Sequence, residues 1–227
     1  MSVGDGSPIP AASLLYLFGG DVLPHPHFSL SHLFTTEHPV HLPCHGGTVV
    51  LGPLECHLFA WTFWQLHEFG VVQLTLENPQ STRQRRDDWL GLDISVRTIS
   101  DAALVGVLAD ELLVHCTDEP TLVSSVVVAW GRAKGVDPKR FVFLPLNGIV
   151  DLIHLDTCIY LGAEPLPPDQ SRLDCEEVTL RRPTFNEMRA EWGRFVDQQS
   201  DLASALVRCC DAGLARLRPP KTAAAVT

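Results

Sequence analysis

Residues 54–69 are predicted to form a helix that belongs in the interior of a protein. Apolar side chains cover most of its circumference and leave only a narrow polar stripe. The apolar residues are Leu58, Phe59, Trp61, Phe63, Trp64, Leu66 and Phe69, and the polar ones are Glu55, Thr62, Gln65 and Glu68. Such a helix needs other elements around it, and a chain of 227 residues is long enough to supply them.

Short strands are predicted on both sides of this helix. One strand is expected at 48–51, Gly70 ends the helix, and strands at 71–77 and 92–99 pair naturally as a hairpin. The order of helix, strand, basic loop and strand resembles the end of a winged-helix unit. The resemblance concerns element order alone.

The second half of the chain predicts further helices and strands. Helices are expected at 101–115 and 120–134, each with capping residues at its start. Residues 140–146 and 148–162 are rich in β-branched and aromatic side chains, which favours strands. The predicted fold class is therefore mixed α/β, with the winged-helix-like unit inside the core and a long C-terminal helix.

Five segments of different composition follow one another along the chain. Residues 1–47, rich in His, Pro and Gly, predict an irregular arm with little helix. Residues 48–162 form the α/β core, and 163–182 form a proline-rich linker. Residues 183–218 form a long amphipathic helix, and 219–227 form a flexible tail.

Charge narrows the range of partners. The formal net charge is -10 at pH 7, and no Lys or Arg precedes Arg83. Such a chain repels phosphate backbones unless its cations gather on one face, so nucleic acid is not the expected partner. No apolar run reaches the roughly 18 residues of a membrane-spanning helix, and residues 12–18 are too short for a signal peptide. We therefore expect a soluble, acidic, cytoplasmic protein.

The cysteines are odd in number and form no C-x-x-C pair. They are Cys44, Cys56, Cys116, Cys158, Cys175, Cys209 and Cys210. This spacing predicts reduced thiols and not a secreted disulfide framework.

Residues 24–47 are unusually rich in metal-binding side chains. The candidate ligands are His25, His27, His32, His38, His41, Cys44 and His45. A zinc site needs three or four of them to converge, yet four prolines favour an extended path and no hydrolase motif is present. We expect no cofactor and a polar arm, with zinc as the alternative.

The sequence DLIHLDTC offers the best candidate for catalysis. On a strand, His154 and Asp156 would project to one side about 6.6 Å apart, and Cys158 would share that face. A His and Asp pair can orient a general base, and the thiol leaves a nucleophilic mechanism open. No serine in a G-x-S-x-G turn accompanies them, so we name no catalytic residue.

The basic loop STRQRR offers the best candidate for nucleic-acid binding. Arg83, Arg85 and Arg86 lie where a wing would contact a phosphate. The helix that would enter a groove carries no cation, which argues against DNA.

The C-terminal helix predicts an oligomer. Apolar residues recur along it at helical spacing: Phe185, Met188, Trp192, Val196, Leu206, Cys210, Leu214 and Leu217. A rod of about 50 Å is longer than a compact core covers, so a second copy is expected to cover the stripe. The alternative is that the helix folds back over its own chain.

Three functions follow from these observations. The leading hypothesis is a non-enzymatic adaptor or regulatory subunit that acts through protein contacts, with itself or with another protein. The first alternative is a metal-dependent hydrolase that uses the histidine arm with His154 and Asp156. The second is a winged-helix transcription regulator.

Overall fold

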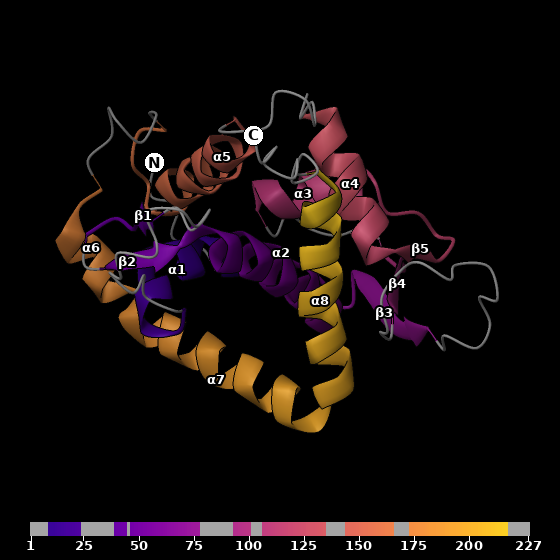
Figure 1. Ribbon diagram of the computed structural model, residues 1–227. Helices are drawn as coiled ribbons and strands as arrows, with labels where there is room; N and C mark the ends of the chain where they lie inside the picture. Colours follow the sequence, from indigo (N-terminus) through magenta and orange to yellow (C-terminus); the bar gives the residue numbers. More distant parts are fainter. Residues whose placement is uncertain are drawn as a thin grey trace, which may run out of the picture.

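The computed structural model describes residues 9–23, 39–44, 46–77, 93–100, 106–134, 144–165 and 173–217. Within them the fold is mixed α/β, as predicted, with eight α-helices and two small antiparallel sheets (Figure 1). Among the described helices, none is both long enough and apolar enough to cross a membrane. The elements are α1 (Ala11–Phe18), the 3-10 helix η1 (Gly19–Asp21), β1 (Pro39–His41), β2 (Thr48–Val50), α2 (Leu51–Glu68), β3 (Val72–Glu77), β4 (Asp93–Thr98), α3 (Val107–Leu113), β5 (Thr121–Leu122), α4 (Val123–Ala133), α5 (Leu144–Tyr160), α6 (Cys175–Leu180), α7 (Arg182–Gln198) and α8 (Ser200–Leu217).

Helix α2 lies in the interior, as its composition predicts, and α1, α8 and α5 pack around it (Figure 1). Most of the polar stripe is enclosed as well. The Thr62 hydroxyl donates to the carbonyl oxygen of Leu58, and Gln65 is buried against α1. Phe69 was expected in the core, but it follows the last residue of α2 and is 49% exposed.

Helix α1 corrects the prediction of an irregular arm over residues 1–47. Every residue from Ala11 to Phe18 is buried. No side chain of α1 itself caps its first turn; instead, the Gln65 side chain accepts from the Ala11 N–H at 2.8 Å and donates to the Ile9 carbonyl at 2.6 Å. A buried apolar helix forms here because α2 satisfies the amide that its own sequence leaves open.

The larger sheet confirms the predicted pairing of two strands. Strands β3 and β4 are antiparallel, from Val72 opposite Thr98 to Glu77 opposite Asp93. The two-residue strand β5, which was not predicted, extends the sheet on the β4 side and leads directly into α4. The helix–strand–strand order of the expected unit is therefore present.

Helix α5 replaces the strands that were predicted at 140–146 and 148–162, whose first residues, 140–143, lie outside the described part of the chain. Buried side chains recur at Ile149, Ile153 and Thr157, one helical turn apart, and the Thr157 hydroxyl donates to the Ile153 carbonyl. Contacts with α1 and α3 cover this face. Packing against neighbours has outweighed the strand preference of the β-branched residues.

The predicted helix 183–218 is two helices that meet at a corner (Figure 1). Gln199 breaks the rod with a non-helical backbone conformation, φ -133° and ψ 50°, and α8 then runs back along α2 and α4. Ser200 and Asp201, which are typical of helix starts, are the sequence signal for this break. Part of the expected linker, Cys175–Leu180, is also helical, as α6.

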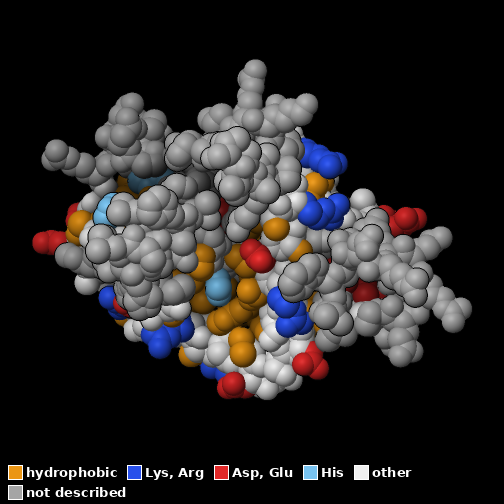
Figure 2. Space-filling view, viewed as in Figure 1, with side chains coloured by type: hydrophobic (Ala, Val, Ile, Leu, Met, Phe, Trp, Pro, Cys, Tyr) orange, Lys and Arg blue, Asp and Glu red, His pale blue; other side chains and the backbone are white. Residues whose placement is uncertain are grey.

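The apolar stripe of these helices packs within its own chain. Phe185, Leu206, Cys210, Leu214 and Leu217 are buried in the core, whereas the side chains on the inner side of α7 are half-buried against it. In Figure 2 hydrophobic side chains reach the surface in the area that α2, α7 and α8 enclose in Figure 1. The half-buried members of the stripe are Met188, Trp192 and Val196. The stripe requires no second chain to cover it, so it does not support the predicted homodimer.

Candidate functional site

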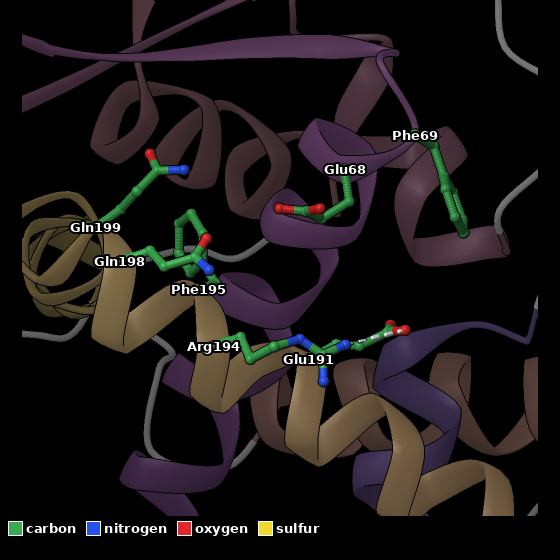
Figure 3. A pocket seen from close by; sticks show the side chains of 7 residues that line it. All are labelled: Glu68, Phe69, Glu191, Arg194, Phe195, Gln198 and Gln199. Carbon is green, nitrogen blue, oxygen red and sulfur yellow. Dashed lines mark ion pairs between the residues drawn. The ribbon is translucent and has the colours of Figure 1, made fainter.

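An open hollow lies between the end of α2 and the last two turns of α7 (Figure 3). Its volume is about 330 Å³. The residues that line it are Glu68, Phe69, Glu191, Arg194, Phe195, Gln198 and Gln199. We refer to it as the α2–α7 hollow.

Aromatic rings hold α7 against α2 next to this hollow. Trp192 lies 5.7 Å from Trp61 and 5.5 Å from Trp64, measured between ring centroids. Phe195 adds contacts to Trp64 and Trp192, and it is buried. The hollow lies beside these rings, and its two aromatic lining residues are Phe195, which is buried, and Phe69, which is exposed.

The rim of the hollow is polar and carries two carboxylates and one guanidinium. In Figure 3 the Glu68 carboxylate is turned toward α7, whereas the Arg194 guanidinium is turned toward Glu191, 3.7 Å away. Gln198 and Gln199 end α7, where the last carbonyl groups of a helix carry partial negative charge. The arrangement can accept a cationic group beside an apolar one.

Two exposed apolar side chains lie where α2 and the sheet meet. Gly70, with φ 66°, ends the helix after Phe69, and the Ile99 N–H donates to the Val71 carbonyl at 2.9 Å. Phe69 and Ile99 are 49% and 51% exposed. They add apolar surface beside the polar rim.

The proposed catalytic residues divide into two sets, because α5 is a helix and not a strand. Residues two apart on a helix differ in direction by roughly 200°, so His154 and Asp156 do not share a face as predicted. His154 does meet Cys158 one turn later, with 3.4 Å between Nε2 and Sγ. On its other side the Tyr16 hydroxyl lies 3.3 Å from His154 Nδ1. All three side chains are buried, which gives a polar contact inside the core.

Asp156 serves a neighbouring helix. Its Oδ2 accepts from the Val107 N–H at 3.0 Å and so caps the start of α3, whose own N-cap residue, Gly106, has no side chain. The pKa of Asp156 is raised to about 6, chiefly by burial and to a smaller extent by the nearby Asp110, while the N–H groups of Val107 and Leu108 act in the opposite direction. This carboxyl is structural.

The expected metal ligands have other partners where the structure describes them. His41 pairs through Nδ1 with the Thr48 hydroxyl at 2.9 Å, across the β1–β2 hairpin. Cys44 is bonded to Cys175, so the prediction that the cysteines are reduced is wrong for this pair. The remaining candidates His25, His27, His32, His38 and His45 lie outside the described residues. In the part of the chain that is described, no three side chains are grouped to hold a metal ion.

The helix that the nucleic-acid hypothesis requires to enter a DNA groove is not accessible. Helix α2 is enclosed by other helices, so it cannot enter a DNA groove. Arg83, Arg85 and Arg86 lie outside the described residues.

Comparison of the chain with protein-family models, curated proteins and solved structures finds no match in any of the three. The candidate site therefore depends on geometry alone. Sequence patterns missed the hollow because it combines the ends of two helices that are distant in the chain. The signals that were present are Gly70 after α2 and Ser200 after α7.

Proposed function

We propose that this protein works through protein contacts, as an adaptor or regulatory subunit with no reaction of its own, and that the α2–α7 hollow receives a segment of its partner. The supporting observation is the combination of an exposed apolar side chain, Phe69, with two carboxylates, Glu68 and Glu191, in the lining of one open hollow. Protein interfaces commonly place one apolar anchor in a pocket and surround it with polar contacts.

The partner segment that suits this hollow is basic and carries one large apolar side chain. The Glu68 carboxylate is turned into the hollow, and the end of α7 adds its negative dipole (Figure 3). Arg194, the basic residue in the lining, is directed at Glu191. A net charge of -10 also favours a cationic partner during encounter.

The two alternative functions receive less support. A hydrolase would need His154 and Asp156 to act together, and they lie on different sides of α5. A transcription regulator would need an accessible α2. We also propose a cytoplasmic location. The Cys44–Cys175 disulfide is an argument against a strongly reducing compartment.

A labelled peptide tests the proposal. The probe is a fluorescent octapeptide in which two arginines flank a central leucine, and fluorescence anisotropy measures its binding to the full chain. We expect binding that weakens with added salt, because the rim is exposed and salt screens it. Reversal of one rim charge, Glu68→Lys, should weaken binding by about threefold to tenfold, as about 1 kcal/mol implies.

The matched controls distinguish binding in the hollow from a general effect of the protein's net charge on peptide binding. Glu164→Lys makes the same change in net charge at an exposed residue after α5 that does not line the hollow, and it should leave the affinity nearly unchanged. A peptide with glutamates in place of the arginines should not bind. Equal losses in the Glu68 and Glu164 variants would contradict the proposed site.

A further inference from the structure

The seven cysteines divide into one accessible pair and five buried thiols. The pair is the disulfide Cys44–Cys175, with Cα atoms 5.3 Å apart and a sequence separation of 131. Cys175 is exposed as the first residue of α6, and Cys44 is half-buried in the turn between β1 and β2. The free cysteines Cys56, Cys116, Cys158, Cys209 and Cys210 are all buried.

Burial also makes several free thiols poor nucleophiles. It raises the pKa of Cys116 and of Cys209 to about 12, and it raises the pKa of Cys210 well above its usual range. The thiolate is the reactive form, so these three cysteines carry almost none of it at neutral pH. Since all five free thiols are buried, thiol chemistry in the native protein is confined to the accessible pair.

We propose that Cys44–Cys175 is a site of reversible thiol–disulfide exchange that takes a small or protein dithiol as its reductant. A thiolate of the reductant attacks the Sγ of Cys175, the more exposed of the two residues, the bond between the two cysteines breaks, and Cys44 leaves as a thiolate that takes up a proton. The second thiol of the reductant then attacks its own sulfur in the mixed disulfide and displaces Cys175. Two electrons pass to the protein, and the reductant becomes a disulfide.

The backbone at Cys44 explains what reduction changes. Cys44 has φ 53°, the left-handed conformation that residues other than glycine seldom adopt. The bond holds this turn to the start of α6, which makes its other main contacts with α7 and buries Val178. Reduction removes the covalent constraint, so the turn and α6 gain freedom together.

The change stays local, because other contacts hold the start of α7. Arg182 forms an ion pair with Asp21 and lies over the Phe18 ring, 4.8 Å from its centroid. Phe185 packs against Phe18 with ring centroids 5.2 Å apart. The core, α7 and α8 therefore remain folded when the bond opens.

Alkylation and hydrogen exchange test this inference on the full chain. The native protein is treated with dithiothreitol, then with N-ethylmaleimide, and the labelled residues are mapped by mass spectrometry. We expect no labelling without reductant and two labels after it, at Cys44 and Cys175. Amide exchange should then rise severalfold in 39–50 and 173–181 and stay unchanged in α2 and α8.

Two variants complete the test. The Cys44→Ser/Cys175→Ser double variant should reproduce the exchange pattern of the reduced protein without dithiothreitol, whereas Cys116→Ala should respond to dithiothreitol as the wild type does. Labelling of Cys44 and Cys175 before reduction would overturn the inference. So would labelling of the buried cysteines at a similar rate, or exchange that rises throughout α2 and α8.

Discussion

Asp156 shows how one buried carboxyl can link stability to pH. Its pKa is about 6 in the folded protein and 3.8 without that environment, chiefly because burial disfavours the charged form. The folded state therefore binds this proton more tightly than the unfolded chain does. The contribution of Asp156 to stability is fully present below pH 4 and is lost as the pH rises through 6.

The variant Asp156→Asn tests this linkage, because the amide keeps an acceptor for the Val107 N–H but does not ionise. Between pH 4 and pH 7 the free energy of unfolding of the wild type should fall relative to that of the variant by up to about 3 kcal/mol. Urea unfolding at pH 4, 5.5 and 7 measures the difference. Asp197→Asn, on the exposed side of α7, serves as the control, and a constant difference between wild type and Asp156→Asn would contradict the assignment.

At the scale of elements, local signals predicted some segments well and others not at all. The interior helix and the β3–β4 pair were predicted because Gly70, strand alternation and an all-round apolar surface are encoded nearby. Helix α5 was predicted as strand because its apolar run is rich in β-branched residues, and periodicity alone does not separate a buried strand from a buried helix. The same error made the site prediction wrong, because His154 and Asp156 would share one face of a strand but do not share one face of a helix.

The crossing of α4 and α8 yields a prediction about Gly213, with Gly193 of α7 as its control. A Cβ added at Gly213 of α8 would lie 2.8 Å from the Val127 Cβ and 2.9 Å from the Ser124 carbonyl oxygen, both on α4. Gly213→Ala should therefore lower the free energy of unfolding by about 1–3 kcal/mol. Gly193→Ala, in α7 where no atom lies within 4 Å of the new Cβ, should raise it by up to about 1 kcal/mol. Equal effects in thermal unfolding would mean that the crossing is not tightly packed.

At the scale of the whole molecule, periodicity showed which face of a helix is apolar but not which surface covers it. The stripe from Phe185 to Leu217 was predicted correctly as a pattern, yet a corner at Gln199 folds it onto α2 and α4. The α2–α7 hollow was also not predictable from periodicity. It lies beside aromatic contacts between residues more than a hundred positions apart in the chain, such as Trp64 with Trp192. Such contacts arise from packing and leave no local pattern.

Because its stripe is internal, the protein should be monomeric at tens of micromolar, and a net charge of -10 further opposes self-association. Leu206→Ala removes a fully buried side chain of α8 and should lower the free energy of unfolding by about 2–5 kcal/mol while the mass in solution stays that of one chain. Leu180→Ala, at a side chain that is 70% exposed, should change stability by less than about 0.5 kcal/mol. Light scattering and urea unfolding measure the two properties on the same samples. A wild-type dimer that Leu206→Ala dissociates without loss of stability would instead assign the stripe to a contact between chains.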